Sequence, residues 1–167
     1  MIVADRIKNM KKESGVTLVE LIIVIAIVAI TVTIGVPSFQ TMFANNRIAG
    51  QSNTFVGSLY LARSEAVKWN QQVDVVSGGD WNTGWQGLTD TDNDGSIDDV
   101  LQTVEALTGG TTFSASTANT ISYDANGRVT AGTGAYTLNN TNAGSTRNIN
   151  LNLMGRVSLM CGANPCI

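Results

Sequence analysis

The sequence predicts an α+β protein in which a long N-terminal helix, membrane-spanning in its first half, packs on a mainly antiparallel β-sheet domain. Three observations support this prediction. From Val16 to Val36 the only charged residue is Glu20. Beyond this run, apolar residues recur at the three-and-four spacing of an amphipathic helix. After Asn70 the composition shifts to Gly, Thr, Asn and Ser, with short β-type runs and no second long helix.

The apolar run, residues 16–36, is long enough to cross a bilayer as a helix, because roughly 20 apolar residues suffice. It is longer than the apolar region of an ordinary signal peptide, and no A-x-A cleavage site follows it. The preceding segment, residues 1–15, has four basic residues against two acidic ones. Positive charge on this flank predicts that it stays cytoplasmic and that the rest of the chain is exported.

Glu20 lies five residues into this predicted membrane helix. An acidic residue within a membrane is costly and is usually paired, so it marks a functional hypothesis. No partner is obvious nearby in the sequence, but cleavage after Gly15 would create an α-amino group at Val16. The alternative is a plain single-pass anchor in which Glu20 is incidental.

The second half of the long helix is predicted over residues 37–70, with Pro37 kinking it without ending it. One face is expected to be buried on a sheet. That face consists of Ile48, Phe55, Leu59, Ala62, Ala66 and Trp69. The alternative is a membrane anchor joined to an unrelated domain.

Residues 71–167 are predicted to form a β-rich domain, because short β-type runs alternate with turn signals. The predicted strands are Val73–Val76, Trp85–Leu88, Leu101–Glu105, Thr120–Tyr123, Ala135–Leu138, Ile149–Leu153 and Arg156–Met160. The polar run from Thr108 to Asn119 is expected to be a surface loop. Trp81 and Trp85 are expected to pack in the core or at an edge, in preference to stacking on a ligand.

Composition argues against two function classes. The chain has no histidine, the commonest general base, and no G-x-S-x-G or phosphate-binding glycine loop in context, so we predict that it is not an enzyme. After Val36 it has six basic and ten acidic residues, a net charge of −4. This balance disfavours a general nucleic-acid binder, because phosphate contacts dominate such affinity.

The two cysteines, Cys161 and Cys166, are predicted to form a disulfide. The Gly, Asn and Pro residues between them favour a tight turn, and a bacterial periplasm permits the bond. The alternative is two free thiols.

An Asp-rich stretch predicts a calcium site with a structural role, and Ca²⁺ is the one cofactor that the sequence suggests. The predicted ligands are Asp90, Asp92, Asp94, Ser96 and Asp98. Their spacing, with Gly95 at position six, matches the front half of an EF-hand loop, but Leu101 replaces the glutamate at position twelve. The alternative is a solvated hairpin loop rich in turn-forming residues.

The stretch from Lys11 to Pro37 resembles the prepilin signature of type IV pilins and type II secretion pseudopilins: a basic leader ending in Gly, a hydrophobic residue, Thr-Leu-x-Glu and a long apolar helix. This resemblance implies a lollipop-shaped pilin fold. It also implies that a prepilin peptidase removes the leader, residues 1–15, and methylates Val16. Glu20 would neutralise an N-terminal amine during assembly. One departure is Val16 itself, where the family usually has Phe.

The C-terminal half resembles the GspH/FimT branch of pilin-like proteins, which includes FimU. Three features carry the match. Gly84-Trp85 precedes the Asp-rich loop, Tyr123–Arg128 has an aromatic-x-x-x-Gly-Arg pattern, and residues 150–157 precede a late cysteine.

Together the resemblances imply a minor pilin or pseudopilin that helps to initiate or cap a type IV pilus or type II secretion pseudopilus. Expected partners are other minor pilins or pseudopilins, a major pilin, prepilin peptidase and an inner-membrane assembly platform. The expected location is the bacterial inner membrane, with the C-terminal domain in the periplasm, and then the filament. Alternatives are a DNA-binding minor pilin for DNA uptake, although residues 155–158 lack the second arginine of a Gly-Arg-x-Arg patch, or a single-pass periplasmic adhesin or sensor.

Overall fold

The computed structural model describes residues 15–90, 96–97, 99–115, 119–162 and 164–165. The chain divides into two compact units, Met1–Ser38 and Phe39–Ile167, and each is described by itself. Helix α1, Leu18–Trp69, contributes to both units.

In the first unit, α1 is apolar and its side chains are exposed. Its most apolar 18-residue window has a mean hydropathy of 2.8, so by length and composition this stretch is able to cross a membrane. Pro37 lies inside the helix and does not end it.

In the second unit the helix ends at Trp69, after which Asn70 adopts a left-handed conformation with φ 54°. The Gln71 N–H then donates to the Ala66 carbonyl, which is the usual C-terminal stop of a helix.

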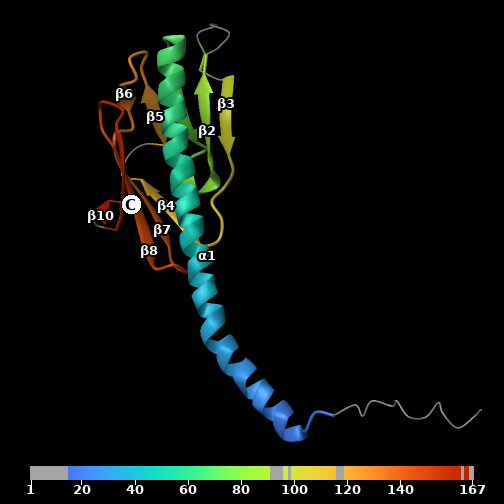
Figure 1. Ribbon diagram of the computed structural model, residues 1–167. Helices are drawn as coiled ribbons and strands as arrows, with labels where there is room; N and C mark the ends of the chain where they lie inside the picture. The colour runs from blue at the N-terminus through green and yellow to red at the C-terminus, as the bar shows by residue number, and fades with distance from the viewer. Residues whose placement is uncertain (1–14, 91–95, 98, 116–118, 163, 166–167) are drawn as a thin grey trace, which may run out of the picture. The chain divides into compact units, whose positions relative to one another are not determined.

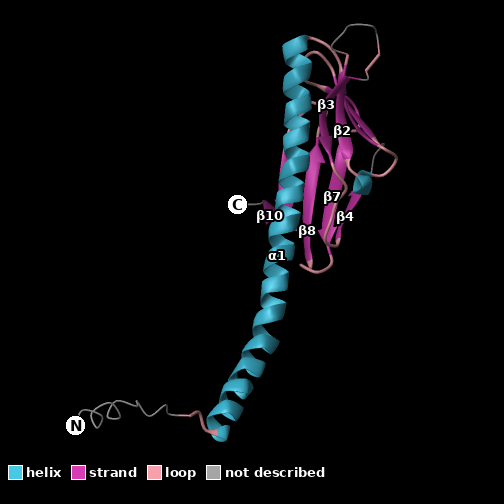
Figure 2. Cartoon of the chain, turned by 90° about the vertical axis from the view of Figure 1, so that its right-hand side faces the viewer, coloured by secondary structure: helices cyan, strands magenta, loops and turns pink. Residues whose placement is uncertain are grey.

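The second unit contains the C-terminal half of α1, a short 3₁₀ helix (η1, Trp81–Thr83) and two five-stranded sheets (Figures 1 and 2). One sheet has the order β3-β2-β1-β5-β6, and the other has the order β10-β9-β8-β7-β4. All the pairings are antiparallel within the described residues. The strands are β1 Val73–Ser77, β2 Trp85–Thr89, β3 Asp99–Val104, β4 Thr111–Ala115, β5 Thr120–Tyr123, β6 Val129–Ala131, β7 Gly134–Asn140, β8 Ser145–Leu151, β9 Val157–Cys161 and β10 Asn164–Pro165.

The predicted fold class is therefore confirmed, and each of the seven predicted strands overlaps an observed one. The prediction that Thr108–Asn119 is a polar surface loop is wrong, because β4 occupies residues 111–115 and pairs with β7. Its inward side chains, Thr111 and Phe113, are buried although the segment is polar overall. The tertiary fold supplies the apolar surroundings that the local composition does not indicate.

The core lies between α1 and both sheets, and Phe55 of α1 is fully buried in it. The ring centroid of Phe55 lies 4.8–5.4 Å from four other aromatic rings. These rings belong to Trp81, Trp85, Phe113 and Tyr136. The Trp85 indole N–H also donates to Ser58 Oγ at 2.9 Å. Both tryptophans are core residues, as predicted.

Gly84 connects η1 to β2 in a conformation that only glycine adopts readily, with φ 100° and ψ −178°. A Cβ at this position would lie 2.2 Å from the Val104 carbonyl oxygen. We expect Gly84→Ala to lower the free energy of unfolding by about 1–3 kcal/mol from backbone strain, with the clash adding to this. The measurement is the urea midpoint of tryptophan fluorescence for the full chain in detergent micelles.

Gly57→Ala is the matched control for Gly84→Ala. Gly57 is an exposed helical residue, and a Cβ there meets no heavy atom within 4 Å. Alanine is favoured over glycine in a helix by roughly 0.5–1 kcal/mol, so this variant should unfold at the same or a higher urea concentration. Equal midpoints for the two variants would contradict the strained role of Gly84.

Candidate functional site

The three described residues before α1, residues 15–17, are exposed and lie outside regular secondary structure. Gly15, Val16 and Thr17 precede the first helical residue, Leu18, so the peptide bond after Gly15 lies outside the helix. A peptide bond in exposed, non-helical chain can be presented to a peptidase without unfolding a helix. This geometry suits the predicted cleavage between Gly15 and Val16.

Glu20 folds back onto Thr17 and caps the helix. The Glu20 N–H donates to Thr17 Oγ1 and the Thr17 N–H donates to Glu20 Oε2, each at 3.2 Å. This reciprocal pair is a capping box, which satisfies two backbone donors at a helix start. It also places the negative carboxylate near the positive end of the helix dipole. Sequence reasoning missed this role, although Thr-x-x-Glu before an apolar run is its signature.

Two threonine hydroxyl groups in the apolar stretch form hydrogen bonds within the helix itself. Thr31 Oγ1 donates to the Ile27 carbonyl at 2.8 Å, and Thr33 Oγ1 donates to the Ala29 carbonyl at 2.6 Å. In lipid each unsatisfied polar group is costly, so these internal bonds make the hydroxyl groups compatible with a bilayer.

The predicted disulfide involves one described cysteine. Cys161 is the last residue of β9, where it pairs with Asn164 of β10 across a tight hairpin. Cys166 lies outside the described residues. The disulfide therefore stays a prediction.

The predicted calcium site lies partly outside the described residues. Asp90 and Ser96 are described, whereas Asp92, Asp94 and Asp98 are not. The stretch joins strands β2 and β3, so it lacks the flanking helices of an EF-hand. Among the described residues, no group of three or more His, Cys, Asp or Glu side chains is placed to hold a metal. Calcium binding remains a prediction.

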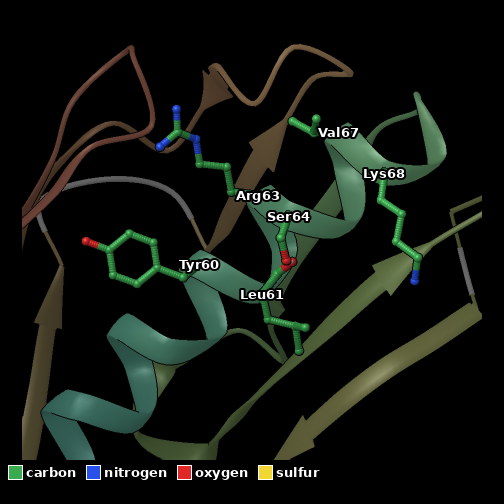
Figure 3. Close-up of a pocket in the computed structure, with 6 residues that line it drawn as sticks. All are labelled: Tyr60, Leu61, Arg63, Ser64, Val67 and Lys68. Atoms are coloured by element: carbon green, nitrogen blue, oxygen red, sulfur yellow. The ribbon is translucent and has the colours of Figure 1, made fainter.

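The exposed face of α1 carries a shallow groove that the sequence did not predict. It is lined by Tyr60, Leu61, Arg63, Ser64, Val67 and Lys68. Figure 3 shows Tyr60 and Arg63 extending to one side of the helix and Leu61 and Lys68 to the other.

Beside this groove, Glu65 holds two neighbouring side chains. Its carboxylate accepts from Lys68 Nζ at 3.0 Å and from Trp69 Nε1 at 2.7 Å. Lys68 Nζ also lies 4.8 Å from the centroid of the Trp69 ring. The hydrogen bonds from Lys68 and then Trp69 hold the pKa of Glu65 below its usual value.

Comparisons with solved structures identify two folds similar to this one. The type IV minor pilin FimU of Pseudomonas aeruginosa is 18% identical, with 73% of this chain and 94% of that chain covered and a TM-score of 0.55. The minor pseudopilin EpsH from the Type 2 Secretion System of Vibrio cholerae is 16% identical, with 71% and 99% covered and a TM-score of 0.51. These likenesses confirm the pilin-like fold. A search of curated proteins found no match.

Comparison with protein families gives two matches. Residues 10–36 match the prokaryotic N-terminal methylation motif, which contains Gly15, Val16 and Glu20. Residues 51–155, more than half of the chain, match the family described as type II transport protein GspH. The chain belongs to the GspH family of pilin-like proteins and carries an N-terminal methylation motif.

Proposed function

We propose that this protein is a minor pilin or pseudopilin that prepilin peptidase processes and that then helps to initiate or cap a filament. The observation that carries this proposal is the methylation motif, which continues directly into an exposed apolar helix and a GspH domain. Both FimU, a type IV minor pilin, and EpsH, a pseudopilin, have this fold, so the filament is a type IV pilus or a type II secretion pseudopilus. The comparisons support neither the DNA-uptake role nor the adhesin or sensor role.

The capping geometry supports a proposed role for Glu20 after cleavage. Removal of the leader would leave a positive amine on Val16, two residues before a helix whose N-terminal end is itself positive. Among the described residues, the Thr17 N–H and the Thr17 hydroxyl group both donate to Glu20 Oε2. A carboxylate can accept hydrogen bonds at both of its oxygens. Oε1 is therefore available for an ammonium group of the same chain or of a neighbour, while the cap stays in place.

The proposed location and partners follow from the same elements. The basic leader favours retention on the cytoplasmic side, so the GspH domain would lie in the periplasm. The apolar stretch of α1 would hold the chain in the inner membrane until an assembly platform transfers it to the filament. Other pilins or pseudopilins would then cover the apolar side chains that lipid covered before.

The test is the N-terminus of the protein purified from bacterial membranes, measured by mass spectrometry. We expect a chain that begins at Val16 and carries one added methyl group. The same chain from cells without prepilin peptidase should begin at Met1. A chain that begins at Met1 in cells with an active peptidase would contradict the proposal.

A further inference from the structure

The two sheets, as described, end in four outer strands, and three of these strands have protected edges. In the second sheet, the Asn82 side-chain amide donates to the Phe113 carbonyl of β4 at 3.1 Å, and its Oδ1 accepts the Phe113 N–H at 2.7 Å. At the other side of that sheet, β10 is two residues long and ends in Pro165, which has no N–H to donate. In the first sheet, the Val129 N–H of β6 donates to the Leu153 carbonyl at 3.0 Å. Each of these features hinders another strand from joining the sheet.

The outer edge of β3 has no such protection in the part of the chain that the structure describes. Figure 1 shows β3 at the border of the domain, with β2 beside it. Opposite the register shift between Gly87 and Leu88, Leu101 has no partner, so the regular part of this edge is residues 102–104. Among the described elements, the backbone of these three residues bonds only to β2. The strand also contains no lysine, arginine or proline that would discourage another strand.

A pocket of about 270 Å³ lies beside this edge on the outer face of the first sheet. Its lining includes Val76 of β1, Gln86 and Leu88 of β2, and Thr103 of β3. Burial alternates along β1 and β2, and the lining residues named here belong to the less buried set, so they face away from the core. A strand added to β3 would place alternate side chains on this same face. The pocket therefore lies next to the position that such a side chain would take.

Glu105 is the charged residue of this pocket, and it has no counter-ion among the described residues. It follows β3 directly, and its side chain is exposed. A carboxylate beside an open strand edge favours a basic side chain on the strand that joins it. Asp99 begins β3, so this strand has an acid at each end. Antiparallel pairing of two β3 strands would place these acids opposite each other, which disfavours a second copy of this chain as the partner.

We propose that the edge of β3 receives a short extended segment from a different pilin-like subunit of the same filament, with a lysine or arginine of that segment beside Glu105. The backbone groups of the edge fit an extended protein chain, while the pocket and Glu105 select among such chains. One edge takes one strand, so the contact suits a subunit that starts or caps a filament and does not repeat along it. This inference rests on the proposed filament function.

The experiment places the photoreactive residue benzoylphenylalanine at Thr103 of the full chain, in cells that assemble the filament. The matched control has the same residue at Thr112, an exposed threonine of β4, whose edge Asn82 covers. After illumination of sheared filaments, we expect an adduct between position 103 and a different pilin-like subunit, and none from position 112. Mass spectrometry should map the attachment to an extended segment of the partner that contains a lysine or arginine.

A second labelled position covers the case in which the first variant does not enter filaments. Gln86 lies beside Thr103 on the outer face, with its Nε2 donating to Thr103 Oγ1 at 3.4 Å. Benzoylphenylalanine at Gln86 should give an adduct with the same segment of the same partner.

Charge exchange tests the pairing with Glu105. Glu105→Lys should lower the yield of the adduct by about fivefold or more, because it places like charges side by side. Changing the mapped basic residue of the partner to glutamate should restore the yield. Recovery when both changes are present excludes misfolding as the cause of the loss.

Four results would overturn the proposal. They are no adduct from either labelled position in filaments, an equal adduct from Thr112, attachment to a second copy of this chain, and attachment to a helix of the partner. If the chain nevertheless begins at Val16 and is present in filaments, the proposed function stays intact, so the two failures are distinguishable.

Discussion

Glu20→Ala is expected to leave the protein in the membrane and to remove it from filaments. The substitution deletes both the cap on Thr17 and the carboxylate that would neutralise the Val16 amine. An amine left unpaired among apolar helices costs about 3–5 kcal/mol, as when one partner of a buried ion pair is lost. Incorporation should therefore fall by more than roughly a hundredfold. The measurement is the amount of the protein in sheared filaments relative to the amount in membranes.

Two further variants separate the charge of Glu20 from its capping role. Glu20→Gln keeps an oxygen that can accept from the Thr17 N–H but removes the charge, so we expect it to fail like Glu20→Ala. Thr17→Ala removes the hydroxyl cap, worth about 1 kcal/mol, but keeps the charge, so it should still enter filaments. If Glu20→Gln assembles normally while Thr17→Ala does not, the cap is what matters. Wild-type levels of Glu20→Ala in filaments would reject both roles.

Phe55→Ala is expected to lower the free energy of unfolding by about 3–5 kcal/mol, because it empties the centre of the core. Phe55 is fully buried and contacts rings from η1, β2, β4 and β7. Its removal would weaken the attachment of α1 to both sheets at once. The measurement is urea unfolding of the full chain in detergent, followed by fluorescence of the two core tryptophans.

Tyr60→Ala is the control for Phe55→Ala, because it removes an aromatic side chain of similar size from the exposed face of the same helix. Surface substitutions away from special features usually change stability by no more than about 0.5 kcal/mol. An unfolding midpoint for Phe55→Ala close to that of Tyr60→Ala would show that the aromatic cluster does not hold the domain together.

The sequence alone predicted the class of fold and the pilin-like family, and it also predicted an apolar helix long enough to span a membrane, because these depend on patterns that run continuously along the chain. An apolar run with the single charge of Glu20 and a helical spacing that continues to Trp69 are visible without any partner. The expectation that Trp69 is buried is wrong, because its side chain is 52% exposed. The Thr17–Glu20 capping box was missed, although its Thr-x-x-Glu pattern spans only four residues and is visible in the sequence. These features depend on the fixed spacing of neighbouring residues in a helix.

Tertiary structure decided the features that join distant segments. Strand β4 was missed because Phe113 is its one large apolar residue, and the rings around it come from α1, η1, β2 and β7. Arg63 contacts two turns, Asp124–Arg128 and Asn152–Arg156, whose glycines Gly127 and Gly155 lie 64 and 92 residues further along the chain. Each turn is recognisable locally, but their contact depends on which strands pair and in which register. Long-range pairing is selected by burial of the whole domain, and no local pattern encodes it.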